Sequence, residues 1–159
     1  ILHKPDRLTA AEYELVKTHA DIGADFVTTI HGLRHLVPFI RHHHERWDGQ
    51  GYPLGLAGEA IPLEARILNV CDSIEAMASD RPYHQAMSAV EITAELQRCA
   101  GSQFDPAVVQ AFTRITEREG AGLVVNSART VALQRTERDL AAHSLGVELL
   151  KPIYAAAMV

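Results

Sequence analysis

The feature that most constrains the fold is residues 48–62, a segment rich in glycine and proline between stretches with helical periodicity. The segment reads DGQGYPLGLAGEAIP and holds four glycines and two prolines within fifteen residues. That density excludes a continuous helix or strand, so we predict a compact loop. No alternating strand pattern competes elsewhere in the chain, and we therefore predict an all-α fold.

The region before this loop begins with a helix-capping signal. Thr9 and Glu12 have the spacing of a capping box, and apolar side chains follow at helix-like intervals in residues 9–30. We expect one or two helices in this region, with His19 near their junction.

A second helical stretch, residues 32–47, leads directly into the loop. Pro38 predicts a kink or a late helix start within it. Its C-terminal end carries His43 and His44, together with His42.

The stretch after the loop, residues 63–79, is predicted to be a helix with a carboxylate on its apolar face. Burial of an unpaired carboxylate costs several kcal/mol, so Asp72 is expected to form a salt bridge with an arginine or to bind a metal ion. The residues expected along or beside the inward face are Ala65, Leu68, Cys71, Asp72, Ile74 and Ala78.

Two more amphipathic helices are predicted at residues 88–100 and 105–116, the second opened by Asp105 as cap and Pro106 as first helical residue. The prediction is therefore a bundle of about five helices over residues 1–116. Residues 117–159 contain no motif and are interpreted as a linker and helical tail.

Charge and cysteine content narrow the functional classes. A net charge of −5 gives no general attraction to duplex nucleic acid or to an anionic membrane. The chain contains no apolar run near the roughly 18 residues that cross a bilayer. Cys71 and Cys99 lie in apolar helical stretches and are predicted to be buried thiols of a cytoplasmic protein.

The histidines suggest a metal site. Successive positions of a helix point about 100 degrees apart, so His43 and His44 are expected to bind two neighbouring ions, or one ion and a hydrogen-bond partner, more readily than both binding a single ion. The alternative is a solvated helix end, to which His42 is assigned. His19 alone would be an ordinary core or surface histidine. Together with His43, His44 and Asp72 it makes a nitrogen and oxygen ligand set suited to iron, manganese, nickel or zinc.

The segment HHERWDGQGYP, residues 43–53, resembles the signature of HD-GYP domains. The resemblance continues on both sides, in LHKPDRLTAAEYELVKTHADIGADF before it and IPLEARILNVCDSIEAMASDRPYHQAMS after it. It covers residues 1–112, because GSQFDPAVVQAF matches the usual end of the domain.

The resemblance implies roles for individual residues. His19, His43, His44 and Asp72 would bind two or three divalent ions, usually iron or manganese. Gly51, Tyr52 and Pro53 would form the loop beside the substrate, with Gly51 permitting a turn that other residues resist. Arg81 would bind phosphate, and His84 stands where a second basic residue is usual. The alternative for Arg81 is an ion pair with Asp80 or Asp48.

The resemblance also implies the reaction. HD-GYP domains hydrolyse cyclic di-GMP to linear pGpG and GMP in bacterial second-messenger signalling, and no side-chain nucleophile is required. Such domains commonly accompany sensory, receiver or GGDEF-type domains, which are the expected partners.

Three departures from the family pattern affect these expectations. The His-Asp doublet is expected upstream of Ile1, so the chain is interpreted as the C-terminal part of the domain; Glu75 replaces the usual Asp, and His84 replaces a stronger base. We expect this chain alone to be inactive, and poorly stable or oligomeric because of exposed apolar faces.

Two other functions compete with hydrolysis of cyclic di-GMP. The first is a degenerate helical module that binds a cyclic dinucleotide or a partner protein without catalysis. The second is a related hydrolase acting on another cyclic nucleotide, which the GYP loop disfavours.

Overall fold

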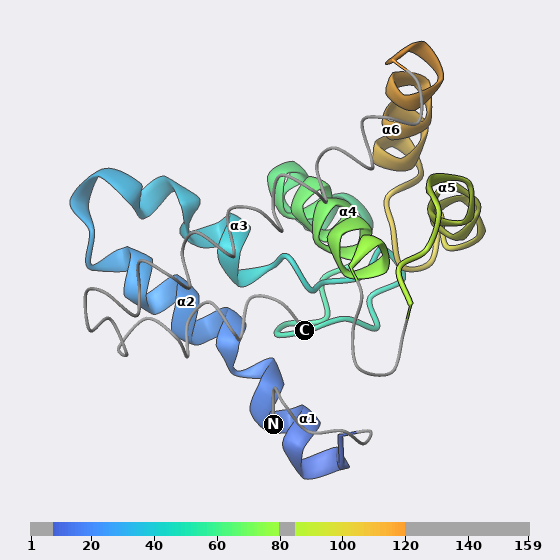
Figure 1. Cartoon of the computed structure of the whole chain (residues 1–159). Coiled ribbons are helices and arrows are strands. Elements are labelled where there is room, and N and C mark those ends of the chain that lie inside the picture. The colour runs from blue at the N-terminus through green and yellow to red at the C-terminus, as the bar shows by residue number, and fades with distance from the viewer. Residues whose placement is uncertain (1–7, 80–84, 120–159) are drawn as a thin grey trace, which may run out of the picture.

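The computed structural model describes residues 8–79 and 85–119, and these residues form helices joined by loops, with no named strand among them (Figure 1). The all-α prediction is confirmed, whereas the helical tail predicted after residue 119 lies outside the described residues. The elements in order are α1 (Ala10–Lys17), α2 (His19–Thr28), the 3-10 helix η1 (His31–Leu36), α3 (Val37–Arg41), the 3-10 helix η2 (Gly58–Ala60), α4 (Leu63–Ala78), α5 (Ala89–Arg98) and α6 (Pro106–Glu119).

The first two helices begin as the sequence predicts. The Thr9 hydroxyl accepts the backbone N–H of Glu12 at 3.3 Å, and the Glu12 carboxylate accepts that of Thr9 at 2.6 Å. This reciprocal capping box starts α1. Helix α1 ends at Lys17 and α2 begins at His19, so this histidine lies at the junction, as expected.

Helix α3 is shorter than predicted. A 3-10 turn precedes it, and Pro38 falls in its first turn, so the late helix start is confirmed. The helix ends at Arg41, and His43 and His44 therefore lie in the turn that follows it.

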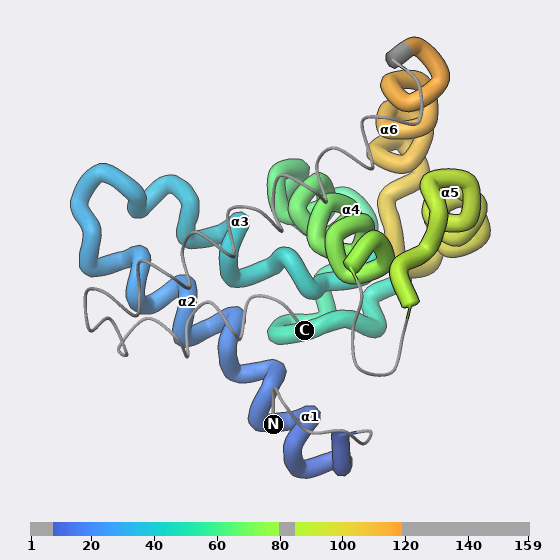
Figure 2. The backbone as a smooth tube through the Cα atoms, viewed as in Figure 1, coloured from blue at the N-terminus to red at the C-terminus, as the bar shows by residue number. Residues whose placement is uncertain are grey.

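Helix α4 occupies the middle of the molecule, packed against α3 on one side and against α5 and α6 on the other (Figure 2). Its buried residues are Ala65, Asn69, Val70 and Ile74. The prediction placed Leu68 and Cys71 on the inward face, and both are exposed, so the buried-thiol prediction holds for Cys99 and is wrong for Cys71. The inward face is rotated relative to the predicted one, because α4 must cover neighbours on two sides.

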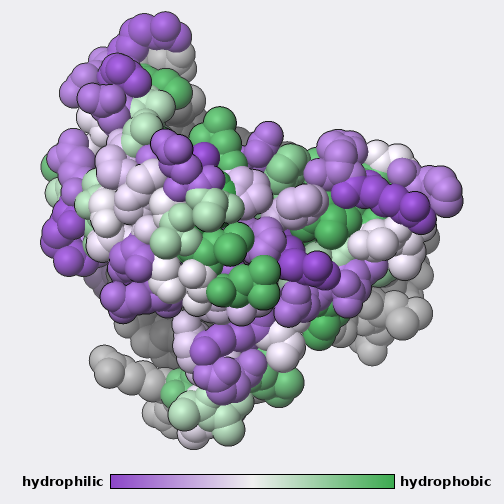
Figure 3. All heavy atoms as spheres, turned by 180° about the vertical axis from the view of Figure 1, so that it is seen from behind, coloured by the Kyte–Doolittle hydropathy of each residue, from purple (hydrophilic) through white to green (hydrophobic). Residues whose placement is uncertain are grey.

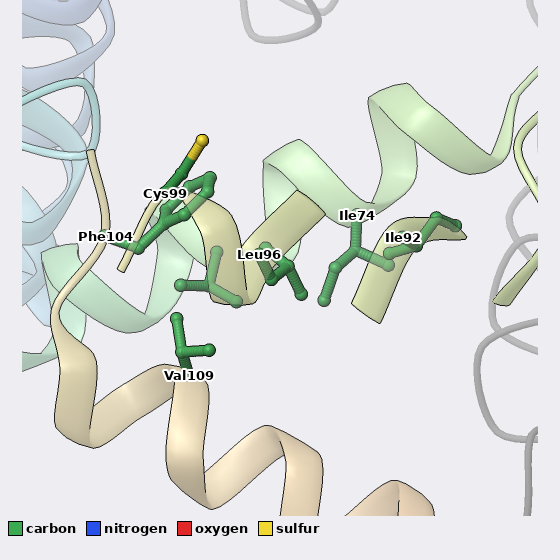
Figure 4. Packing of buried hydrophobic residues seen from close by; sticks show 7 residues of the cluster. Ile74, Ile92, Leu96, Cys99, Phe104 and Val109 are labelled. Carbon is green, nitrogen blue, oxygen red and sulfur yellow. The ribbon is translucent and has the colours of Figure 1, made fainter. Parts of the chain in front are cut away.

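The apolar core joins α4, α5 and α6. Figure 4 shows its side chains converging from these helices and from the segment between α5 and α6. Burying a large aliphatic side chain contributes about 1.5 to 3 kcal/mol relative to leaving it exposed, so this cluster supplies much of the stability of the described fold. Its members are Val70, Ile74, Ile92, Leu96, Cys99, Phe104 and Val109.

Helices α5 and α6 both start at side-chain caps, and the predicted cap and first residue of α6 are confirmed. Ser88 and Glu91 form a capping box before α5. The Asp105 carboxylate accepts the N–H of Ala107 at 2.7 Å, and Pro106 is the first residue of α6.

Several large apolar side chains are exposed on the helices, and Figure 3 shows apolar (green) patches among hydrophilic ones on the face seen from behind. Those on α1, α2 and α4 include Leu15, Ile22, Phe26, Leu63, Ile67 and Leu68. The expectation that the chain associates with itself stays a prediction. Among the described helices, none is long and apolar enough to cross a membrane.

Candidate metal site and adjoining loop

Three predicted ligands come together at one point of the structure. His19 is the first residue of α2, and His43 and His44 lie in the turn after α3. The Nε2 atom of His19 lies 3.0 Å from Nε2 of His44 and 3.5 Å from Nε2 of His43. One ring nitrogen from each of the three residues lies within 4.8 Å of the others. We call these three residues the histidine group.

The two adjacent histidines do not diverge as expected. Their ring centroids are 4.0 Å apart and the rings are inclined at 41°. The expectation of 100-degree divergence assumed that both residues are helical, whereas they lie in a turn, where successive side chains can face the same side. Both imidazoles therefore face His19.

Backbone carbonyls fix the orientation of two of these rings. Nδ1 of His19 lies 2.6 Å from the carbonyl oxygen of Val16, and Nδ1 of His43 lies 2.6 Å from that of Ile40. Because a carbonyl oxygen can only accept, each Nδ1 carries the proton and each Nε2 presents a lone pair. Metal-binding histidines typically use their second ring nitrogen in this way.

The separations within the group suit a shared cation. An ion held at 2.0 to 2.1 Å by two imidazoles, at angles between 90 and 109 degrees, places the two nitrogens about 2.8 to 3.4 Å apart. The two Nε2–Nε2 distances that involve His19 are 3.0 and 3.5 Å. In addition, the Nε2 lone pairs of His19 and His43 face each other and repel. A cation bound between them would remove this repulsion. The residues present therefore fit a divalent transition metal.

Burial keeps the histidine group uncharged. It lowers the pKa of His19, although the hydrogen bond to Val16 opposes this, and it lowers the pKa of His43 despite the bond to Ile40. Burial, followed by repulsion from the other two imidazoles, lowers the pKa of His44 to about 3. Neutral imidazole is the form that binds a metal ion, so the group is ready to do so at neutral pH.

The lowered pKa values predict that the metal-free protein loses stability below neutral pH. A histidine has a pKa near 6.5 when unfolded, so from about pH 6.5 downwards the unfolded chain binds more protons than the folded one. His44 alone should cost about 2 kcal/mol of unfolding free energy at pH 5. Urea denaturation at pH 7.5 and pH 5 measures this difference. His35→Gln, which changes an exposed histidine, should keep it, and equal stability at both pH values would contradict it.

The aromatic ring of Tyr52 covers the histidine group. It stacks on His44 with centroids 4.9 Å apart, and it meets the rings of His19 and Tyr13 edge to face. Burial, followed by the nearby Tyr13 and Asp72, raises the pKa of the Tyr52 hydroxyl. The phenol therefore stays protonated and can donate a hydrogen bond. Pro53 follows it through a cis peptide bond.

Gly51 brings the loop of residues 48–62, which we call the Tyr52 loop, against the backbone of the turn that carries His43 and His44, which we call the histidine turn. A Cβ atom at this position would lie 2.3 Å from the nitrogen of Arg46 and 2.6 Å from both the Cα of Glu45 and the carbonyl oxygen of His44. The N–H of Tyr52 donates to that same carbonyl oxygen at 3.2 Å. Glycine is required here by close backbone approach, not by the unusual turn conformation that was predicted, because the positive φ angles lie at other glycines.

The other predicted site residues are Asp72, which the structure describes, and Arg81 and His84, which it does not. Asp72 is half-buried on α4, lies outside the histidine group, and is close enough to Tyr52 to raise its pKa. Its role as a ligand stays a prediction. Arg81 and His84 lie outside the described residues.

Close packing sets the distance between the helices that carry these histidines. A Cβ atom on Gly23 of α2 would lie 3.3 Å from the side chain of Ile40 in α3. On the surface, the Arg41 guanidinium pairs with Asp21 at 3.0 Å and with Asp25 at 2.9 Å. Exposed pairs of this kind contribute little, so close packing such as that at Gly23 contributes more to the position of His19 opposite His43.

Sequence reasoning missed two buried polar residues beside the group. The side chain of Glu45 is fully buried, and Asn69 is buried on α4. His42, which was assigned to a solvated helix end, has a side chain only 12% exposed, with Nδ1 3.5 Å from the Glu45 carboxylate. The assignment is wrong because the chain turns after Arg41 and places His42 against Glu45. A charged run such as HHHER gives no sign of burial, whereas Asn69 could have been noticed as an amide within an apolar stripe.

The fold and the site together define a class: an all-helical module with a histidine group beside a glycine-rich loop, suited to binding divalent metal. The family model described as HD domain matches residues 1–108, more than half of the chain. The chain therefore belongs to the HD domain family. The predicted domain end at residue 116, and with it the tail at 117–159, stays a prediction.

Curated proteins with similar sequences agree with this family. A cyclic di-GMP phosphodiesterase of Pseudomonas aeruginosa is 44% identical over 115 residues, which are 72% of this chain and 28% of that protein. The cyclic di-GMP phosphodiesterase response regulator RpfG of Xanthomonas campestris pv. campestris is 42% identical over 116 residues, 72% of this chain and 31% of that protein. A 3'3'-cGAMP-specific phosphodiesterase of Vibrio cholerae is 33% identical over 114 residues, 69% of this chain and 22% of that protein.

These matches confirm the resemblance drawn from residues 43–53. The aligned region spans between 22% and 31% of the length of these three relatives.

Proposed function

We propose that this chain is part of a metal-dependent phosphodiesterase that hydrolyses cyclic di-GMP to pGpG and GMP in bacterial second-messenger signalling. The observation that carries the proposal is the histidine group, in which lone pairs from His19 and His43 face each other beneath the Tyr52 loop. Relatives named as cyclic di-GMP phosphodiesterases support this substrate.

The protein's own residues would prepare the site for this reaction. His19, His43 and His44, with Asp72 from α4, would hold two or three divalent ions, iron or manganese. Bound there, such ions lower the pKa of water and neutralise phosphate charge. Tyr52, which stays protonated, would donate a hydrogen bond to the substrate, and Arg81 and His84 would bind its phosphate groups.

The proposal is tested on the full-length protein that contains this chain. Metal analysis should find bound iron or manganese, and incubation with cyclic di-GMP should release pGpG or GMP. A protein that binds no transition metal would overturn the proposal. A protein that binds metal and nucleotide without turnover would instead be the non-catalytic binding module. Cleavage of 3'3'-cGAMP alone would identify the other substrate class.

The partners that we propose follow from the same relatives. One of them is named a response regulator, which supports a receiver domain as a companion of this module. The exposed apolar side chains of α1, α2 and α4 support self-association of the protein. We also propose a cytoplasmic location.

A further inference from the structure

We infer that Glu45 is a positioning residue that holds the Tyr52 loop over the histidine group. This inference rests on the proposed function, because the loop is the substrate side of that site. Glu45 follows His44 directly in the chain. Its side chain is fully buried, which is unusual for a glutamate unless its oxygens are satisfied.

The carboxylate of Glu45 binds the part of the loop that follows Pro53, which is the far side of the loop as seen from Gly51. One oxygen accepts the backbone N–H of Leu54 at 2.8 Å, and the other accepts that of Leu56 at 3.0 Å. Leu54 directly follows the Gly51-Tyr52-Pro53 sequence, and Leu56 lies two residues beyond Leu54. Hydrogen bonds from backbone N–H groups to a charged acceptor are roughly twice as strong as neutral ones, so Glu45 fixes the loop where it leaves Pro53.

The backbone of Glu45 is held just as firmly. Its carbonyl oxygen accepts the side-chain amide of Asn69 on α4 at 2.8 Å, and its N–H donates to the carbonyl of His42 at 3.0 Å. The Nδ1 atom of His42 lies 3.5 Å from the same carboxylate. One residue thus connects the histidine turn, helix α4 and the loop.

The geometry of the loop explains why this connection matters to the site. The near side of the loop lies against the histidine turn at Gly51, where Tyr52 bonds to the carbonyl of His44 and stacks on its ring. The far side is held by Glu45. Releasing the far side would let the Tyr52 ring move relative to His44, while His19 and His43 keep their own backbone partners. Glu45 therefore affects substrate contact more than metal binding.

The test is Glu45→Gln in the full-length protein. The amide keeps the shape of the side chain, but its NH₂ group faces one of the two loop N–H donors and cannot accept from it. We expect kcat/KM for cyclic di-GMP to fall about 10- to 100-fold, mainly through a higher KM, with metal content close to wild type. The matched control is Asp105→Asn, which alters a buried carboxylate that accepts hydrogen bonds from the Arg66 guanidinium at 2.6 Å and from the Ala107 N–H at 2.7 Å, not from the N–H groups of Leu54 and Leu56. It should lower stability and leave KM unchanged.

A second measurement separates this inference from the proposed function. In metal-free protein with isotope-labelled histidine, stacking on Tyr52 shifts the ring protons of His44 in NMR spectra. Glu45→Gln should reduce this shift, and Glu45→Asp, a second variant in case the first fails to fold, should reduce it less. If wild-type protein shows no hydrolysis, the proposed function fails while this shift still tests Glu45. A wild-type shift in the folded variants, or an unchanged KM, would overturn the inference.

Discussion

Replacing His19 with alanine should lower the metal content of the protein to below about a tenth of the wild-type value. His19 is the member of the group whose Nε2 lies close to both partners, at 3.0 Å from His44 and 3.5 Å from His43. Loss of even an outer residue that orients a ligand costs 10- to 100-fold in affinity or activity, so loss of a ligand should cost at least as much. Phosphodiesterase activity should fall with the metal. Elemental analysis after equilibration with iron or manganese measures the effect.

The control for this substitution is His35→Ala, which removes an exposed histidine of η1 that lies outside the histidine group. It should bind as much metal as the wild type. Wild-type metal content in His19→Ala would show that the histidine group is not the binding site.

Replacing Gly51 with alanine should lower kcat/KM about 100-fold and also reduce stability. The added Cβ would lie 2.3 to 2.6 Å from three backbone atoms of residues 44–46, so no flexible side chain can move to accommodate it. Overpacking typically costs about 1 to 3 kcal/mol, and a displacement of about 1 Å at a substrate-positioning group can cost 10²-fold in rate. Steady-state kinetics and urea denaturation measure the two effects.

Gly32→Ala provides a matched comparison, because a Cβ there would meet no atom within 4 Å. It should retain wild-type activity and stability to within about 0.5 kcal/mol. Equal behaviour of the two glycine variants would mean that the loop does not lie against the histidine turn.

Signals that act within a few residues were predicted correctly. The capping residues Thr9 and Asp105, the helix start at Pro106, the late start around Pro38 and the helix junction at His19 all depend on local backbone chemistry. Such signals are readable because the hydrogen bonds that they describe lie within one turn.

Orientation and burial could not be predicted in the same way. Which face of α4 is buried depends on α3, α5 and α6 together, so Cys71 was placed inside when it is exposed. Glu45 sits in a run of charged residues and looks solvated until the loop folds over it. His43 and His44 converge only because the chain leaves the helix at Arg41, an end that no glycine or proline marks.

The connection between the loop and the rest of the fold also gives the molecule an optical reporter. Trp47 is the only tryptophan of the chain. Its backbone N–H donates to the carbonyl oxygen of Gln103 at 3.2 Å, and its backbone carbonyl accepts the N–H of Gly58 at 3.0 Å. Its ring lies 5.7 Å from the guanidinium of Arg66. Intrinsic fluorescence excited at the indole therefore originates where the loop of residues 48–62 meets the segment between α5 and α6, and ordering of the site can be followed without any attached dye.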